Sequence, residues 1–255
     1  MTPLYKISGG SGCTIEVFPG HVRKISPSIE YNHRLLAQMN KQKSWTMYKV
    51  PEVFGTGIIR TLAYMDMERI SGKRFSRSIF DYSLNTAFDT LCSIIPPAES
   101  VVLCNVTDIV IEKVESIVSK TQSKAVITLA ERILDADWTQ FPTGISHGDL
   151  TLENILDTKD GPVVIDFLDT AINSFIIDIA KLLQDTELFW SYRFDGIPDP
   201  MLLKALSALL RRQVMGYSEL LDQILWFNTL RILPYIKDGT TETWLIGTLR
   251  LWGIG

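Results

Sequence analysis

Two segments in the second half of the chain carry acidic and amide side chains at a spacing that could do chemistry. The stretch Ser146–Leu156 reads Ser-His-Gly-Asp-Leu-Thr-Leu-Glu-Asn-Ile-Leu, so that Asn154 follows Asp149 by five residues. The stretch Val163–Asp169 is apolar up to Asp166. Transfer of a phosphoryl group needs one carboxylate beside the accepting hydroxyl and hard oxygen ligands that hold magnesium across the phosphates. These residue types therefore predict Asp149 as the base, and Asn154 with Asp166 as magnesium ligands.

In their order and spacing, the two segments resemble those of the aminoglycoside phosphotransferase and choline kinase family, whose fold is related to that of protein kinases. The resemblance implies that Asp149 is the catalytic aspartate and that Asn154 and Asp166 bind Mg²⁺. Asp166 matches the aspartate of an Asp-Phe-Gly motif, although Leu168 stands here in place of the glycine. ATP and Mg²⁺ are therefore the expected cofactors, and a hydroxyl group of a small molecule is the expected acceptor.

The resemblance also implies an α+β, two-lobed protein-kinase-like fold. A small antiparallel sheet is expected in an N-terminal nucleotide-binding lobe over residues 1–70. A larger helical C-terminal lobe over residues 71–255 is expected to hold the catalytic loop and the acceptor site.

The sequence pattern agrees with this division. Short runs between turns predict five strands and one helix before residue 72, with Ser26 as the cap and Pro27 as the first helical residue. Residues 144–170 favour short strands and loops. Apolar residues recur at helical spacing over 80–96, 105–120, 122–136 and 174–255.

The predicted N-terminal lobe contains candidates for nucleotide binding. A turn between two predicted strands resembles the phosphate-covering loop of kinases and comprises Gly9, Gly10, Ser11 and Gly12. Glycines let backbone N–H groups approach phosphates, although a tight hairpin would have the same composition. By the resemblance, Lys24 contacts the ATP phosphates; the alternative is an exposed lysine on an edge strand. Glu30 could orient Lys24 as an ion pair, or could be an acid favoured at the start of a helix.

Residues 67–72 resemble the hinge between the lobes in this family. By that resemblance, the backbone of Glu68 and Ile70 would hydrogen-bond adenine, with Met67 beside the ring. A plain strand end followed by a turn would read similarly.

Two further residues are interpreted as structural. Asp178 lies in a mostly apolar predicted helix, and a buried carboxylate needs partners. The resemblance implies that Asp178 holds the backbone of the catalytic loop. His147 is expected to pack and form hydrogen bonds beside that loop.

The composition narrows the class of protein. Of the 255 residues, 46% are hydrophobic and 21% charged, as in a folded globular protein, and the net charge of −4 gives no basic footprint for nucleic acid. The three cysteines show no CxxC spacing, so neither a disulfide framework nor a zinc site is predicted. We see no secretory leader and no apolar run of spanning length, and therefore expect no membrane insertion and a cytoplasmic location. The oligomeric state is not predicted.

Two features separate the chain from protein kinases. Thr151 stands where protein serine/threonine kinases resemble one another in having lysine, and eleven residues separate Asp166 from Asp178, too few for an activation segment. A small-molecule acceptor is therefore favoured. Two alternatives remain open: a non-catalytic nucleotide-binding pseudokinase, and nucleotidyl transfer on the same fold.

The sequence constrains the acceptor less. Segment 80–146 holds nine acids against four bases, which would suit a cationic aminoglycoside or choline, or reflect solvated helix faces. Arg231, among apolar residues, could clamp an anionic substrate group or pair internally. The core motif and the C-terminal tail loosely resemble family members associated with bacterial surface-polysaccharide synthesis. We therefore expect a sugar or a sugar-derived metabolite.

Overall fold

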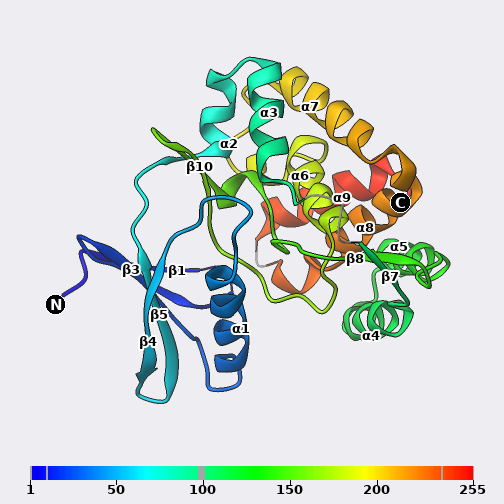
Figure 1. The fold of residues 1–255 in the computed structure, drawn as a ribbon. Coiled ribbons are helices and arrows are strands. Elements are labelled where there is room, and N and C mark those ends of the chain that lie inside the picture. Colours follow the sequence, from blue (N-terminus) through cyan, green and yellow to red (C-terminus); the bar gives the residue numbers. More distant parts are fainter. Residues whose placement is uncertain (1, 10, 97–100, 237, 255) are drawn as a thin grey trace. The chain divides into compact units, whose positions relative to one another are not determined.

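The computed structural model describes residues 2–9, 11–96, 101–236 and 238–254 (Figure 1). The chain divides into two compact units. The first comprises Met1–Phe75 together with Asn154–Asp169, and the second comprises Ser76–Glu153 together with Thr170–Gly255. The predicted division at residue 70 differs from this grouping, because the segment after the catalytic motif joins the first unit.

An antiparallel sheet of five strands forms most of the first unit. Helix α1 (Asn32–Lys43) packs on it, with Leu35 and Met39 against Ala63 and Met65 in a shared apolar core (Figure 1). This confirms the expected sheet with one helix. In the order across the sheet, the strands are β1 (Tyr5–Ser8), β2 (Thr14–Val17), β3 (His21–Ile25), β5 (Leu62–Glu68) and β4 (Val53–Ile59).

Helix α1 begins at Asn32, so the predicted start at Pro27 is wrong. The side chain of Asn32 fixes the start by tertiary contacts, since its Nδ2 donates to the carbonyl of Thr61 at 2.9 Å and its Oδ1 accepts from the N–H of Ala63 at 2.8 Å. These two bonds tie the first helical residue to the turn between β4 and β5. The local capping preference of Ser26 was overridden by this anchor.

A second, three-stranded sheet also belongs to the first unit. Its order is β10-β9-β6, formed by Gly161–Val164, Ile155–Thr158 and Lys73–Arg74. Gly72 stands where only a glycine fits, because a Cβ atom there would lie 2.6 Å from the carbonyl oxygen of Asp157. This pairing explains why residues after Asn154 group with the N-terminal part of the chain.

The second unit is mostly helical. Helix α6 (Phe175–Thr186) is buried along almost its whole length and packs against α7 (Pro200–Gln213) and α8 (Ser218–Leu230). Strand β7 (Val102–Cys104) pairs with β8 (Phe141–Thr143). The remaining elements are α2 (Phe75–Ser78), η1 (Ile79–Asp81), α3 (Leu84–Ile94), α4 (Thr107–Val118), α5 (Lys124–Leu134), η3 (Leu152–Asn154), α6 (Phe175–Thr186), η4 (Trp190–Tyr192), α7 (Pro200–Gln213), η5 (Met215–Tyr217), α8 (Ser218–Leu230), η6 (Leu233–Tyr235) and α9 (Gly239–Leu251).

The helical periods read from the sequence are confirmed in position, within a few residues at each end. Residues 144–170 hold the short strands β9 and β10 with loops, as expected. Among the described residues, no helix combines the length and the apolar character that crossing a lipid bilayer requires.

Candidate active site

Lys24 and Asp166 form an ion pair within the first unit. Lys24 Nζ lies 2.5 Å from Asp166 Oδ1 and also donates to Gln38 Oε1 at 3.2 Å. The lysine side chain is 6% exposed, whereas that of Asp166 is 54% exposed. Burial opposes the charge of Lys24, but the attraction of Asp166 and the hydrogen bond that Lys24 donates to it outweigh burial, so the pKa of Lys24 is raised. Lys24 is therefore a buried, ion-paired cation and not an exposed lysine on an edge strand.

The residues after Asp166 contact α1 and the segment that follows it. Asp166 has a left-handed backbone with φ of 63°, a conformation that aspartate tolerates better than most residues. The ring of Phe167 packs edge-on against Trp45 with centroids 4.9 Å apart, and Lys41 Nζ donates to the carbonyl of Leu168 at 3.0 Å. The turn at Asp166 is thereby held by the neighbouring helix.

The expected ion pair between Glu30 and Lys24 is not formed in the part of the chain that the structure describes. Glu30 is exposed and precedes α1, and hydrogen bonds from the Ser28 side chain and from its own backbone lower its pKa. Gln38 lies on α1 beside Lys24 instead, 2% exposed, and its Nε2 donates to Tyr31 Oη at 3.2 Å.

Gln38 was missed from the sequence, although a signal exists. Leu35, Gln38, Met39 and Gln42 recur at the spacing of one buried helix face, and all four are buried. Polar residues on such a face need internal partners, which points to a functional or structural contact.

The two predicted magnesium ligands are joined through the backbone. The N–H of Ile165, next to Asp166, donates to the carbonyl of Asn154 at 2.9 Å. Asn154 is 9% exposed. Among the described residues, no group of three or more His, Cys, Asp or Glu side chains could hold a metal by itself. Two oxygen donors nevertheless fit magnesium, which is usually held by one or two protein ligands with phosphate oxygens and waters completing the shell.

The glycine-rich segment forms a tight hairpin turn between β1 and β2. The N–H of Gly12 donates to the carbonyl of Gly9 at 2.9 Å, and Gly12 has φ of 82°, which favours glycine. Ser11 is exposed in this turn. Gly10 lies outside the described residues. A role over phosphates stays a prediction for these positions.

The predicted hinge lines a cavity of about 890 Å³ in the first unit. The N–H of Glu68 donates to the carbonyl of Glu52 at 2.8 Å, so a contact of the Glu68 backbone with adenine would have to use its carbonyl oxygen. Met67 packs against the apolar core under the sheet. Adenine contacts at Glu68 and Ile70 stay a prediction. The lining residues are Lys49, Glu68, Arg69, Ile70, Ser71, Gly72, Lys73, Asp157, Thr158, Lys159 and Asp160.

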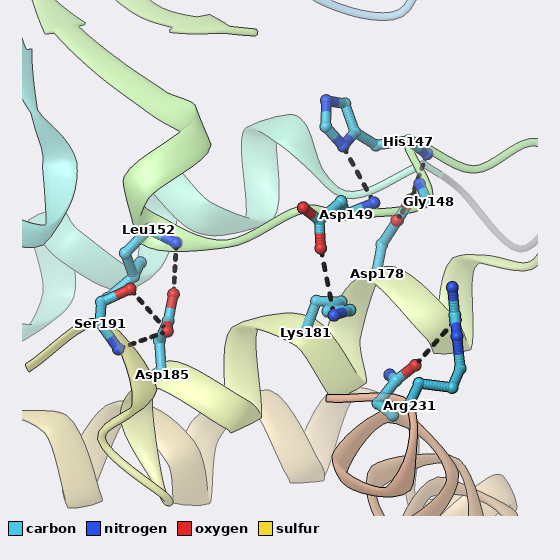
Figure 2. Close-up of polar contacts among 10 residues, drawn as sticks. His147, Gly148, Asp149, Leu152, Asp178, Lys181, Asp185, Ser191 and Arg231 are labelled. Atoms are coloured by element: carbon cyan, nitrogen blue, oxygen red, sulfur yellow. Dashed lines mark hydrogen bonds and ion pairs between the residues drawn. The ribbon is translucent and has the colours of Figure 1, made fainter. Parts of the chain in front are cut away.

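In the second unit, Asp178 holds the start of the predicted catalytic loop, residues 147–152 (Figure 2). Its Oδ2 accepts from the N–H of His147 at 2.6 Å and its Oδ1 from the N–H of Gly148 at 2.8 Å. The N–H of Asp149 donates to His147 Nδ1 at 3.2 Å. These contacts agree with the structural roles expected for Asp178 and for the buried His147.

Lys181, one turn further along α6, contacts the predicted base (Figure 2). Its Nζ lies 3.1 Å from Asp149 Oδ1, and the two side chains are 13% and 31% exposed. Burial of Asp149 favours its neutral form, but the charge and hydrogen bond of Lys181 outweigh this and lower the pKa of Asp149. Smaller effects of His147 and Arg231 act in the same direction. Asp149 is therefore ionised near neutral pH, as a proton acceptor must be.

Asp185 is the third charged residue of α6 that contacts this loop. Its Oδ2 accepts from the N–H of Leu152 at 2.6 Å, and its Oδ1 from the N–H and Oγ of Ser191 at 3.1 and 2.7 Å (Figure 2). Burial raises the pKa of Asp185 to about 7, although these donors favour the ionised form.

Asp178, Lys181 and Asp185 stand at positions i, i+3 and i+7 of one apolar helix, and therefore share a face. They contact the loop at successive points, His147–Gly148, Asp149 and Leu152. Sequence reasoning found Asp178 and missed the other two, although their spacing in an apolar helix was a readable signal.

Arg231 lies just after α8. Its Nη1 is 3.4 Å from Asn228 Oδ1, and its guanidinium carbon is 5.7 Å from the centroid of Phe227. The internal contact with Asn228 agrees with one of the two roles left open by the sequence. Contact with an acceptor stays a prediction.

Residues 111–217 match the model of the phosphotransferase enzyme family. The matched segment contains the catalytic loop, both predicted magnesium ligands and the charged face of α6. The match confirms, over these residues, the resemblance to phosphotransferases that the sequence motifs predicted. No curated protein matches the chain.

Solved structures of the phosphotransferase type match almost the whole chain. An apo thermostable mutant of aminoglycoside phosphotransferase APH(4)-Ia is 12% identical with a TM-score of 0.64, covering 98% of this chain and 94% of that one. A protein described as a fructosamine-3-kinase from Haemophilus somnus 129PT is 16% identical with a TM-score of 0.54, covering 96% and 90%. The likeness confirms the predicted protein-kinase-like fold. Family and fold together indicate a small-molecule kinase, the enzyme class expected from the sequence.

Proposed function

We propose that this phosphotransferase moves the γ-phosphoryl group of ATP, with Mg²⁺, to a hydroxyl of a small molecule in the cytoplasm. The observation that carries the proposal is the catalytic loop itself. Asp149 is partly buried and ionised, and the loop that carries it is held at three points by one face of α6. A positioned carboxylate of this kind is what proton transfer from an acceptor hydroxyl requires.

The proposed reaction uses few protein groups. The acceptor oxygen bonds to the γ-phosphorus while the bond to the β–γ bridging oxygen breaks, and ADP leaves with that electron pair. The hydroxyl proton passes to Asp149 and later to water. Lys24 would bind phosphate oxygens, and Asn154 with Asp166 would hold the metal. Bound Mg²⁺ would neutralise charge on the phosphates during transfer.

A sugar or sugar-derived acceptor is the substrate class that we favour. A related structure of the APH(4)-Ia mutant is a complex with ADP and hygromycin B, and the Haemophilus somnus protein is described as a fructosamine-3-kinase. Both descriptions concern hydroxyl-bearing small molecules. Aminoglycoside or choline-type acceptors are the second candidate, favoured by the acidic excess of segment 80–146.

The test is a panel of hydroxyl acceptors incubated with ATP and Mg²⁺, read by the mass of the product. A product heavier by one phosphate group supports the proposal, whereas a nucleotidyl adduct would support nucleotidyl transfer. Asp149→Asn should lower turnover by about two orders of magnitude while nucleotide binding persists.

Asp89→Asn is the matched control, because Asp89 is an exposed carboxylate on α3. Equal rates for Asp149→Asn and the parent would remove Asp149 from the role of base. No nucleotide turnover at all, with nucleotide binding intact, would favour the pseudokinase alternative.

A further inference from the structure

Lys181 is a mostly buried cation directed at the predicted base (Figure 2). It lies on α6 between Asp178 and Asp185, and those two carboxylates are engaged by backbone N–H groups of the catalytic loop. Lys181 forms an ion pair with Asp149, with Nζ 3.1 Å from Oδ1. A buried ammonium group on an apolar helix is costly unless its charge is compensated, which the Asp149 carboxylate does here.

Resting on the proposed function, we propose that Lys181 is a positioning residue for phosphoryl transfer: its ammonium group fixes the Asp149 carboxylate and compensates its negative charge. The sequence shows why the cation must come from elsewhere in the chain. Protein serine/threonine kinases resemble one another in having a lysine two residues after the base, whereas position 151 carries a threonine here. The cation beside the base therefore comes from α6 and not from the loop.

The compensation has a chemical consequence. An anionic base beside an anionic phosphoryl group experiences repulsion, and a neighbouring ammonium group offsets it. The same ammonium holds one carboxylate oxygen in place, which limits the side chain to a narrow set of rotamers. Both effects act on the transfer step.

Charged groups from three parts of the second unit lie near Asp149. His147 lies on the same loop, Lys181 comes from α6, where Asp178 and Asp185 flank it, and Arg231 follows α8. Of the three neighbours that lower the pKa of Asp149, Lys181 has the largest effect. Removing its charge should therefore raise that pKa more than changing any other single neighbour.

The direct test is ¹³C NMR titration of the Asp149 carboxyl group in the parent, Lys181→Met and Lys181→Arg, between pH 4.5 and 8. In the parent and in Lys181→Arg, the signal should stay that of an ionised carboxylate. In Lys181→Met, the pKa should rise by about one unit or more, since an opposite charge at this distance shifts a carboxyl by about 1–3 units. Lys204→Met is the control, because Lys204 is exposed on α7.

A kinetic test uses Mg²⁺-dependent ATP hydrolysis, with water as the acceptor. Lys181→Met should lower kcat by about tenfold or more and move its acidic limb to higher pH, while the Kd of Mg-ATP stays within about twofold. Lys181→Arg should recover most of the rate.

The outcomes are separable. An unchanged Asp149 titration and an unchanged pH profile in a folded Lys181→Met protein would overturn the inference. A parent protein that binds Mg-ATP but transfers phosphate neither to water nor to any acceptor would overturn the proposed function instead. The NMR result does not depend on turnover, so the two failures cannot be confused.

Discussion

Lys24 Nζ lies 2.5 Å from Asp166 Oδ1, although 142 residues separate the two in the chain. The pair is asymmetric, because the lysine is nearly buried while more than half of the carboxylate surface is exposed. Gln38 adds a neutral contact to Lys24, so Asp166 is the carboxylate that balances its charge. A phosphate group that approached Lys24 would therefore compete with the Asp166 carboxylate.

Lys24→Met tests the role of this buried cation. We expect nucleotide affinity to fall by about tenfold or more, which corresponds to at least ~1.4 kcal/mol, because a charge-assisted phosphate contact is lost. Calorimetric titration with ADP in the absence of magnesium measures the effect separately from the metal. Lys43→Met, at the exposed end of α1, is the control. Affinity within twofold of the parent in Lys24→Met would exclude a phosphate contact by Lys24.

Asp166→Ala and Asn154→Ala test the metal ligands. Both variants should weaken the gain in ATP affinity that magnesium provides, and Asp166→Ala should weaken it more, because it removes a charge as well as an oxygen. Titrations with ATP alone and with Mg-ATP give the difference directly. The assignment would be wrong if both variants kept the magnesium dependence of the parent.

The placement of the motif residues could be predicted from the sequence, because short, ordered spacings carry the motif. Asp149 lies in a loop, Asn154 ends a short 3-10 helix and Asp166 follows strand β10. Their roles in catalysis and metal binding stay predictions. The partner of Lys24 was not predictable in the same way. The Ser26–Pro27 pair is a strong local helix signal, yet Asn32 starts the helix through bonds to the turn between β4 and β5. A tertiary contact overrode a local preference, so Glu30 precedes the helix, and Gln38, further along α1, contacts Lys24.

The charged residues of α6 were predicted only in part. Asp178 was predicted because the family resemblance pointed to it and because a buried carboxylate needs partners, whereas no role was predicted for Lys181 or Asp185. Their spacing places them on one face, but spacing alone cannot tell whether a charged face meets water or a loop. In a helix that is otherwise buried, the physical cost of an unpartnered charge decides this question.

Asp185 should make stability depend on pH. Its pKa is about 7 in the folded protein and close to the ordinary aspartate value when unfolded, so between about pH 4 and 7 the folded state binds the extra proton. The free energy of unfolding should therefore fall as pH rises through this window, by up to about 1.4 kcal/mol per pH unit, and level off above it. Urea unfolding from pH 5 to 8 measures the slope.

Asp185→Asn should remove that slope. The variant should also be less stable at every pH, because an amide nitrogen cannot accept from the N–H groups of both Leu152 and Ser191. Ser191→Ala is the matched comparison, since it removes one donor to Asp185 and should raise the pKa further. A parent and an Asp185→Asn variant with the same pH slope would show that Asp185 does not titrate in this range.

The connection between Asp166 and α6 predicts the class of acceptor. Residues 167–174 separate Asp166 from the first residue of α6, and part of them is already committed. Phe167 packs on Trp45 and the carbonyl of Leu168 accepts from Lys41, while Thr170 Oγ1 donates to the carbonyl of Ile172.

Residues 167–174 are too few, and too many of them already make contacts, to form a peptide-binding platform or a loop switched by phosphorylation. We therefore expect negligible label in generic protein substrates incubated with the enzyme, magnesium and γ-labelled ATP. A small-molecule acceptor should be phosphorylated without prior activation of the enzyme, at the same rate before and after phosphatase treatment. Rapid stoichiometric labelling of a peptide would contradict this expectation and would indicate that the protein acts as a protein kinase. A rate that falls after phosphatase treatment would show that a phosphorylated segment controls the enzyme.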